Sequence, residues 1–251
     1  MKRISATPFV KFSIGCLFLT LLACASMDPI NTDTPEGLYK SGVQLMEQDR
    51  FEEALANFNE LKNKHPYNSL ATEAELKIAD IQFKRENFVE AENAYKLFKE
   101  FHPDHEKIDY VTFRIAMSMY KQLPDSIDRD LNVAEDAQIY FRQVYTNYPK
   151  SDFAGSARDH EQKCRLKLAR SEYYVGEFYY KREKFESALG RFEDVITKFP
   201  NTELIPKSLY WAAMSANNVK DSEKAKKYYF ELINNHPNNH WAARAKRTLK
   251  W

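Results

Sequence analysis

The chain contains one pattern five times: an alanine, an aromatic residue four positions later, and a proline eight positions after that. The residue seven positions after each alanine is also apolar, so alanine, aromatic and apolar residue share one face of an α-helix. Self-similarity at this period is typical of stacked structural repeats. The five copies are Ala54-Phe58-Pro66, Ala91-Tyr95-Pro103, Ala137-Phe141-Pro149, Ala188-Phe192-Pro200 and Ala225-Tyr229-Pro237.

A small residue stands twelve positions before the alanine in four of the five copies: Gly42, Ala79, Gly176 and Ala213. Such a residue lets a preceding helix approach the next helix closely, and the proline ends that second helix. Each copy therefore predicts a helix–turn–helix hairpin and resembles the tetratricopeptide repeat. The fold class that follows is all-α, an α-solenoid of five such repeats in which each hairpin packs against its neighbours.

The spacing of the repeats locates two insertions. Successive prolines are 37, 46, 51 and 37 residues apart, so the third and fourth repeats carry 9 and 14 extra residues. The 9 lie between Ala116 and Ala137, where they predict an enlarged turn inside the third hairpin. The 14 lie within 151–170, which contains no proline, and predict a first helix of the fourth hairpin that is longer by about 3.9 turns.

The last nine residues are left over after the five repeats and predict a terminal helical cap. Basic residues here suit the carboxyl end of a final helix, because the helix dipole favours cations there. Binding to lipid headgroups is the alternative role for them. They are Arg244, Lys246, Arg247 and Lys250.

The N-terminus has the pattern of a secretory signal peptide over residues 1–23. Three basic residues precede an apolar stretch over 12–23, which is shorter than the roughly 20 residues that a membrane-spanning helix needs. The sequence Leu21-Leu22-Ala23-Cys24 resembles the lipobox of bacterial lipoproteins. This resemblance implies cleavage after residue 23 and lipidation of Cys24. Lipidation of Cys16 and an ordinary cleaved signal are the alternatives.

The lipobox pattern also implies a location. Ala25 follows the cysteine, where lipoproteins kept in the inner membrane have Asp, so we expect a lipid anchor in the outer membrane, on its periplasmic face, in a Gram-negative bacterium. The polar segment 24–34 is expected to be a lipidated tether. The remaining chain divides into 35–106, which holds the first two repeats, and 107–251, which holds the last three with the cap.

Composition argues against catalysis and against nucleic-acid binding. The chain has 37 Lys and Arg against 36 Asp and Glu, and its 6 glycines form no phosphate-binding loop. It contains no nucleophile elbow and no His-Glu-x-x-His motif. His102, Asp104 and His105 belong to a loop pattern beside a repeat proline, which favours a structural role over a metal site. We therefore expect no enzyme, no catalytic residue, no metal and no cofactor besides the covalent lipid on Cys24.

Residues 102–202 contain a series of motifs: His102-Pro103-x-His105-x-x-Ile108-Asp109-Tyr110-Val111, Asp128-Arg129-Asp130, Tyr148-Pro149-x-Ser151, Leu168-Ala169-x-x-Glu172, Val175-x-Glu177-x-Tyr179-Tyr180-x-Arg182 and Phe199-Pro200-x-Thr202. They resemble the BamD family of tetratricopeptide lipoproteins, which belong to the machinery that inserts β-barrel proteins into the bacterial outer membrane. The order of these motifs, both insertions and the lipobox agree with the family. Leu131 departs from it, because the family often has a polar residue or proline there.

The resemblance implies that the second half of the solenoid docks on a periplasmic domain of a BamA-like β-barrel insertase. One arginine in the second helix of the fourth repeat makes that contact in the family, and it matches Arg191 here. Tyr173 and Tyr180, expected on the inner face, are further candidate contacts. The alternative for Arg191 is a solvated charge on an outer helix.

The N-terminal half faces substrate in the family. The first helices carry two stripes of mainly apolar residues at helical spacing: Tyr39, Val43 and Met46, and Leu76, Asp80 and Phe83. Such stripes commonly belong to the core. Here Leu38, Gly42 and Leu45 already supply a packing stripe, so the other residues predict a groove for an extended or helical peptide that ends in aromatic residues.

These features predict a non-enzymatic subunit of the β-barrel assembly machinery. Its expected partners are the BamA-like insertase, other assembly lipoproteins and unfolded outer-membrane precursors, with no nucleic acid among them. The alternative is a generic tetratricopeptide envelope lipoprotein that acts as a pilot or chaperone, or as a scaffold for cell-wall or division enzymes. The fold is common to all of these and does not distinguish them.

Overall fold

The computed structural model describes residues 30–249 and 251, and this part of the chain holds eleven α-helices and no strand. The signal segment, Cys24 and most of the tether lie outside the described residues. The helices are α1 (Pro35–Glu47), α2 (Phe51–Lys64), α3 (Ser69–Lys84), α4 (Phe88–Phe101), α5 (Ile108–Lys121), α6 (Asn132–Asn147), α7 (Ala154–Lys181), α8 (Phe185–Lys198), α9 (Ile205–Asn218), α10 (Ser222–Asn235) and α11 (His240–Thr248).

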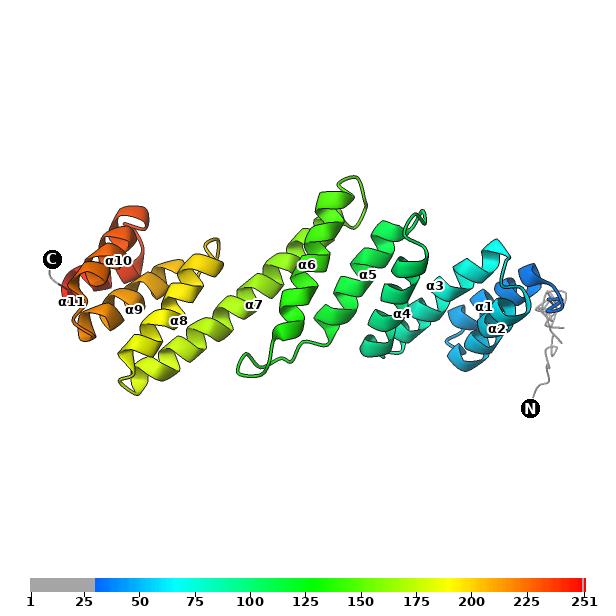
Figure 1. Ribbon diagram of the computed structural model, residues 1–251, viewed down its shortest axis with the longest axis horizontal. Coiled ribbons are helices and arrows are strands. Elements are labelled where there is room, and N and C mark those ends of the chain that lie inside the picture. The colour runs from blue at the N-terminus through cyan, green and yellow to red at the C-terminus, as the bar shows by residue number, and fades with distance from the viewer. Residues whose placement is uncertain (1–29, 250) are drawn as a thin grey trace, which may run out of the picture.

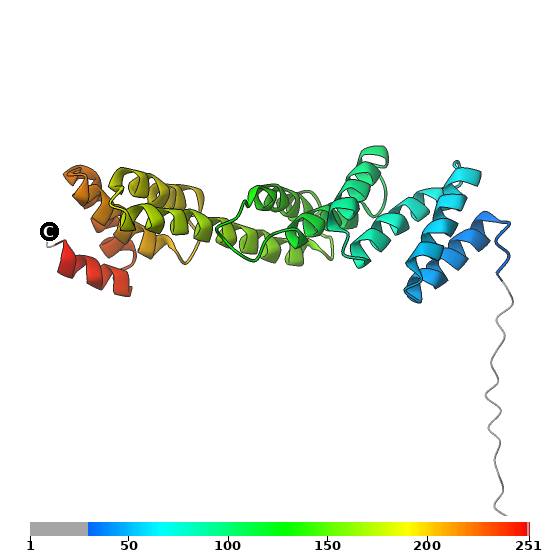
Figure 2. The same cartoon turned by 90° about the horizontal axis from the view of Figure 1, so that it is seen from below.

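The helices pair into five antiparallel hairpins that follow one another along an elongated molecule, with α1 and α2 at one end and α10 and α11 at the other (Figures 1 and 2). Each helix packs chiefly on the helices before and after it in the chain. This is the arrangement of a solenoid, in which neighbouring units bury a continuous core. The predicted all-α solenoid of five repeats is confirmed.

The repeat positions form the contacts inside each hairpin. The five pattern alanines and the aromatic residues that follow them are buried. A Cβ added to Gly42 would lie 2.7 Å from the ring of Phe58, and one added to Gly176 would lie 2.7 Å from the ring of Phe192. The small residue is therefore required because the aromatic ring of the second helix occupies the space where a side chain would stand.

Four hairpins share one tight turn. Its middle residue has a positive φ in each case, although none is glycine: Asp49, Glu86, Glu183 and Lys220. These positions are 37 residues apart within each half of the chain. The third hairpin is different, because residues 122–131 separate α5 from α6. The predicted enlarged turn is confirmed.

The enlarged turn is held against the rest of the molecule. The hydroxyl of Ser171 donates to the carbonyl of Ile127 (2.7 Å), and Lys167 Nζ donates to the carbonyl of Asp125 (3.3 Å). Leu131 is buried, so the residue that departs from the family pattern anchors the end of the turn in the core. The signature residues Asp128, Arg129 and Asp130 are exposed in it, and Asp130 accepts a hydrogen bond from the backbone of Asn132 at the start of α6.

Helix α7 spans 28 residues and joins two hairpins. It packs on α6 and on α8. Buried residues toward its N-terminus include Ala157, Glu161 and Cys164, and those toward its C-terminus include Tyr173 and Gly176. The predicted lengthening of this helix is confirmed. The helix runs without a break from its contact with α6 to its contact with α8 (Figure 1).

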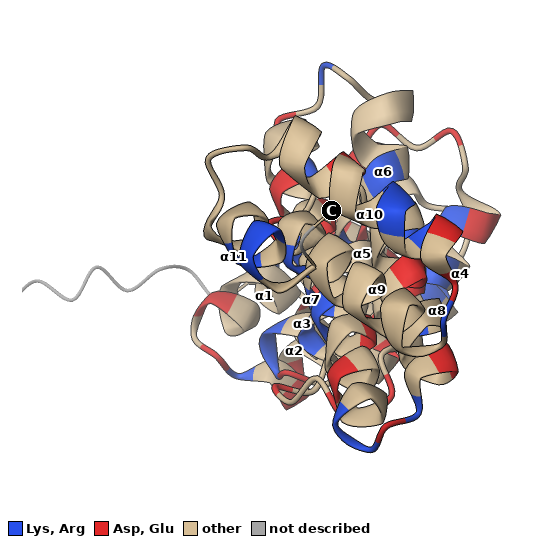
Figure 3. Ribbon diagram, turned by 90° about the vertical axis from the view of Figure 1, so that its left-hand side faces the viewer, with Lys and Arg blue, Asp and Glu red and all other residues tan. Residues whose placement is uncertain are grey.

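The solenoid ends in the short helix α11, as predicted. The guanidinium of Arg244 lies 5.1 to 5.7 Å from the ring centres of Tyr210, Trp211 and Trp241, which fastens α11 to α9. Lys246 and Arg247 occupy the last turn of α11. Figure 3 views this end of the molecule, where basic residues stand on α10 and α11. Within the described residues, no helix has the length and apolarity to cross a bilayer.

Candidate functional site

A cavity of about 300 Å³ opens between α1, α3 and α5. Val43 and Met46 of α1 supply an apolar wall, and the other helices supply charged and polar groups. The remaining lining residues are Glu47, Lys77, Asp80, Lys84, Tyr110 and Arg114.

A buried carboxylate organises the floor of this N-terminal cavity. Oδ1 of Asp80 accepts hydrogen bonds from the hydroxyls of Tyr95 (2.6 Å) and Tyr110 (2.7 Å), which come from α4 and α5. Burial, and then the charge of Asp80, raise the pKa of both tyrosines. Both phenols therefore stay protonated at neutral pH and remain donors, so the network ties three helices together.

Arg114 is held in place beside this carboxylate. Its Nε donates to the hydroxyl of Tyr95 (3.2 Å), and its guanidinium carbon lies 3.6 Å from the ring centre of Phe83. A guanidinium has five N–H donors, and this geometry uses one of them on Tyr95. No carboxylate of the described residues forms an ion pair with Arg114. Oδ2 of Asp80 pairs instead with Lys77, whose Nζ lies 3.6 Å away.

The groove residues predicted from the sequence have different positions. Val43 and Met46 line the cavity, although Met46 is only 8% exposed and also packs in the core of the first repeat, and Phe83 lies beneath Arg114. Tyr39 is half-buried and packs against the ring of Phe58, 5.9 Å away. The assignment of Leu76 to the groove is wrong, because its side chain is 2% exposed and belongs to the core. Helix α3 is covered by hairpins on both sides, whereas α1 lies at the end of the stack. The position on α3 that is equivalent to Tyr39 of α1 is therefore buried.

Sequence reasoning missed the cations of this cavity. Lys40, Lys77 and Arg114 occupy equivalent positions, each 37 residues after the previous one. The repeat period therefore contained a row of basic residues on successive first helices. Only the structure brings Lys77 and Arg114 to one cavity, together with Lys84.

A second surface lies on α7 and α8. Nη1 of Arg191 is 2.9 Å from Oε2 of Glu172, with side-chain exposures of 42% and 28%. Arg191 also lines a shallow hollow of about 470 Å³. Gly190 lies beside Arg191, and a Cβ there would meet nothing within 4 Å, so the backbone is open at this point.

The predicted exposure of Tyr173 is wrong. Tyr173 is 4% exposed, its ring lies 5.5 Å from that of Phe192, and its hydroxyl donates to Glu177. It stands three residues before Gly176, on the side of α7 that packs on α8. Tyr180 is half-buried against Trp211 (4.7 Å between ring centres). The exposed aromatic residues of α7 are instead Tyr174 and Phe178.

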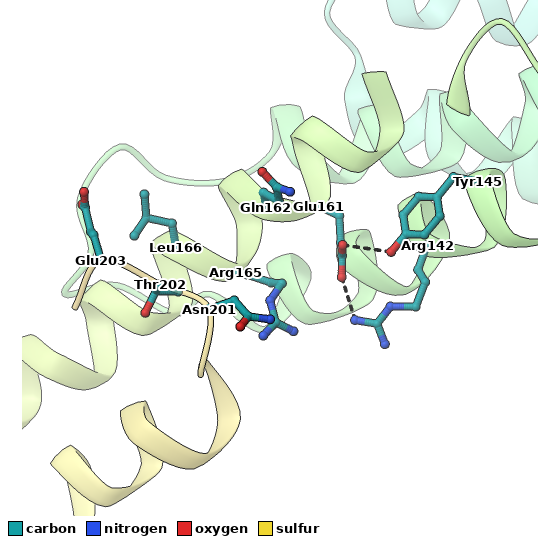
Figure 4. A pocket seen from close by; sticks show the side chains of 9 residues that line it. All are labelled: Arg142, Tyr145, Glu161, Gln162, Arg165, Leu166, Asn201, Thr202 and Glu203. Carbon is teal, nitrogen blue, oxygen red and sulfur yellow. Dashed lines mark hydrogen bonds and ion pairs between the residues drawn. The ribbon is translucent and has the colours of Figure 1, made fainter. Parts of the chain in front are cut away.

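A third cavity, of about 480 Å³, lies where the α8–α9 loop meets α6 and α7 (Figure 4). Its centre is the buried Glu161, which accepts hydrogen bonds from Arg142 Nη2 (2.6 Å) and the hydroxyl of Tyr145 (3.0 Å). These bonds join α7 to α6. Since they satisfy the carboxylate, this network is a structural link between the two helices.

The histidines and the cysteine have structural surroundings. Nε2 of His102 lies 2.9 Å from Glu75, and Nε2 of His105 lies 3.2 Å from Glu73, so the α4–α5 loop is paired with α3. No group of His, Cys, Asp and Glu among the described residues has the arrangement of a metal site. Cys164 is fully buried, and burial raises its pKa to about 12.

Comparison with known proteins places this architecture in a family. The sequence model of the YfiO family, described as "Outer membrane lipoprotein", matches residues 31–229. The chain belongs to the YfiO family. The match begins just before α1 and ends within α10, so it includes both the N-terminal cavity and the Arg191 surface.

Curated relatives of this YfiO-family chain have consistent names. It is 28% identical over 213 residues to "Outer membrane protein assembly factor BamD" of Rickettsia prowazekii, covering 85% of this chain and 84% of that protein. It is 26% identical to the protein of the same name from Caulobacter vibrioides, covering 85% and 70%. The resemblance to the BamD family is confirmed. Among solved structures, the TPR2AB domain of yeast Sti1 is similar with a TM-score of 0.47 and 14% identity, covering 86% and 84%.

Proposed function

We propose that this protein is a non-enzymatic subunit of the machinery that assembles β-barrel proteins in the outer membrane. It holds a BamA-like insertase at the Arg191 surface and receives unfolded precursors at the N-terminal cavity. The observation that carries the proposal is the family match over residues 31–229, because it covers four hairpins and reaches into α10 of the fifth, and the relatives are named assembly factors.

The N-terminal cavity has the chemistry for an unfolded polypeptide. Val43 and Met46 offer apolar contact, and the flexible Met46 side chain adapts to different ligand shapes. Lys77, Lys84 and Arg114 offer donors to backbone carbonyls or carboxylates. Phe83 supports this site from below by stacking under Arg114, and Tyr39 stabilises α1 at its border.

The Arg191 surface has the chemistry for docking a folded partner. A guanidinium binds a carboxylate through two parallel hydrogen bonds, which a lysine cannot reproduce. Glu172 holds Arg191 in an accessible position in the free protein. A partner carboxylate would share or replace that pairing, and the exposed rings of Tyr174 and Phe178 offer apolar area elsewhere on α7.

The lipid anchor belongs to the same proposal. Cys24 would carry the lipid in the outer membrane, and the folded part would begin at Pro35 on the periplasmic side. Eleven tether residues span at most about 40 Å when fully extended. The anchor thus keeps the start of α1 within about 40 Å of the membrane surface, close to the site of barrel insertion and to other assembly lipoproteins.

The test is affinity recovery of the full chain from detergent-solubilised outer membranes. We expect recovery of a large β-barrel protein with periplasmic domains. Reproducible recovery without such a barrel contradicts the proposal and favours a pilot, chaperone or division scaffold.

Exchange of charge at residue 191 tests the docking surface. Arg191→Glu should lower barrel recovery at least tenfold, since it sets two carboxylates against each other and removes the guanidinium. The control is the double variant Arg191→Glu with Glu172→Arg, which restores the internal pair. If the double variant recovers the barrel like the original chain, Arg191 acts only within the solenoid and the docking role is refuted.

A further inference from the structure

We propose that the solvent-facing side of α11 is a second membrane contact, which binds the headgroups of anionic phospholipids at the far end of the solenoid from the lipid anchor. The inference rests on the proposed anchor at Cys24 and adds how the folded part of the protein lies on the membrane.

The C-terminal segment carries charge of one sign. Residues 232–251 contain four Lys and Arg and no Asp or Glu, whereas the whole chain has 37 against 36. On α11, Arg244 and Arg247 follow His240 at helical spacing and share one face with it, and Lys246 is exposed beside them. Two buried alanines form the opposite face of the same helix. The helix thus presents a cationic face to solvent.

The cations of this face have no carboxylate partner within the described part of the chain. Lys246 and Arg247 take part in none of its ion pairs, whereas Lys224 of the neighbouring α10 is paired with Glu193. Charges that are not neutralised inside the molecule remain able to bind anions from outside.

Arg244 is held in position at the edge of the face. Its guanidinium lies 5.1 to 5.7 Å from the centres of three aromatic rings, yet the side chain is exposed. It donates no hydrogen bond to another side chain or carbonyl of the described residues, so its N–H donors remain for phosphate oxygens. Trp241 is half-buried and Trp251 is exposed in the same segment, and such amphipathic rings favour the lipid–water interface.

The placement of α11 lets one membrane reach both ends of the protein. Helices α1 and α11 lie at opposite ends of the elongated molecule (Figures 1 and 2). Viewed along the long axis, they lie on the same side, away from α4 and α8 (Figure 3). With a lipid on Cys24 before α1, contact at α11 is an intramolecular second attachment, which is effective even when each charge contributes little. It would lay the solenoid along the bilayer, with α4 and α8 turned away from it.

Tryptophan fluorescence reports on this contact, because the three tryptophans of the chain are Trp211, Trp241 and Trp251. The purified lipidated protein is bound to vesicles of phosphatidylcholine, alone or with about 30% phosphatidylglycerol, each with and without brominated acyl chains. Bromine quenches tryptophan at short range. Quenching in the anionic vesicles should be about twofold or more that in the neutral ones. It should fall between about 50 mM and 1 M salt, where screening shortens to about 3 Å.

Variants identify the residues responsible. Lys246→Gln with Arg247→Gln should lower quenching in anionic vesicles to the neutral level, because each cation near an anionic surface raises affinity about fivefold. Both residues are exposed, so the double variant should keep its fold. Lys226→Gln with Lys227→Gln removes the same charge from exposed positions of α10 and should leave quenching unchanged. Arg244 stays in both variants because its ring contacts hold α11 in place.

Flotation of the vesicles separates this inference from the proposed function. A chain that floats with both kinds of vesicle but is quenched equally in them keeps its anchor and overturns the contact at α11, which would leave that face to an acidic protein partner. An equal loss of quenching in the two double variants also overturns the assignment to α11. A chain that floats with neither kind of vesicle refutes the anchor together with the inference.

Discussion

Two carboxylates are buried in the described part of the chain, Asp80 in α3 and Glu161 in α7, and they have similar exposure but different surroundings. The tyrosine hydroxyls that donate to Asp80 come from α4 and α5, and the ring of Tyr95 is fully buried. The donors to Glu161 both come from α6, and the side chain of Arg142 is 49% exposed. The first network ties three helices together at the floor of the N-terminal cavity, whereas the second links only α6 to α7.

The hydrophobic cores at the N-terminal end and in the rest of the solenoid differ in size. A small cluster of buried residues joins α1 to α3 and contains Leu38, Phe58 and Ile81. A second cluster runs without interruption from α3 to α11 and contains Phe141, Phe192 and Leu209. A terminal repeat with a small core of its own opens more easily than the interior of a solenoid. The region that we assign to ligand recognition therefore lies at the less stable end.

The largest expected effect comes from truncating the equivalent aromatic residue in each region. Phe58→Ala and Phe192→Ala should each cost about 3 to 5 kcal/mol locally, because both rings are fully buried. In amide hydrogen exchange, Phe58→Ala should lower protection mainly in α1 and α2, and Phe192→Ala should lower it throughout α6 to α10. Equal loss of protection along the whole chain in both variants would contradict the comparison.

The buried carboxylates should differ in their contribution to stability. Asp80→Ala removes the acceptor shared by the Tyr95 and Tyr110 hydroxyls, so we expect a loss of about 2 to 3 kcal/mol in the free energy of unfolding. Glu161→Ala leaves Arg142 free to turn to water, and about 1 kcal/mol should be lost. Urea denaturation of both variants measures the difference, and a larger loss for Glu161→Ala would reverse the assignment.

Two glycines of the fourth hairpin should respond in opposite directions. Gly176→Ala places a Cβ 2.7 Å from Phe192 and should destabilise by about 1 to 2 kcal/mol. Gly190→Ala meets nothing within 4 Å on α8 and should stabilise by about 0.5 to 1 kcal/mol through helix propensity. Thermal unfolding of the two variants tests this pair. Gly42→Ala in the first hairpin should repeat the Gly176 effect, confined to α1 and α2.

The last comparison uses the rate of cysteine labelling, which changes the stability of the protein least. Burial raises the pKa of Cys164 to about 12, so the closed protein holds almost no thiolate at pH 8 and labelling requires opening of the core. An unfolded thiol titrates near pH 8.5, so the stability contributed by the protonated buried thiol is lost as pH rises from about 9 toward 12.

A matched cysteine extends this measurement to the other region. Ala54→Cys, with Cys164→Ser, puts a thiol at a fully buried position of α2. Mass spectrometry of iodoacetamide labelling at pH 8 should show faster modification of the thiol at residue 54 in this variant than of Cys164 in the original chain. Equal rates would mean that both regions open together.

The repeat pattern was sufficient to predict the hairpins, the lengthening of α7, the enlarged turn and the cap. Each of these depends on local spacing: an alanine and an aromatic residue four positions apart share a helix face wherever they occur, and a proline ends a helix. The same local reasoning was wrong for Leu76 and Tyr173. Whether a stripe is open depends on which neighbouring helix covers it, and nothing within one helix states that.

The residues of the candidate site also divide into those that the sequence could identify and those that it could not. Val43 and Met46 were identifiable because they lie on one helix at helical spacing. The network of Asp80, Tyr95 and Arg114 was not, because its members come from three helices. The amino-acid sequence by itself determined the repeat, the helices and their order. Only the tertiary structure decided which residues remain open to a ligand, because the stacking of hairpins covers the interior faces and leaves those at the end of the stack and between α1, α3 and α5 uncovered.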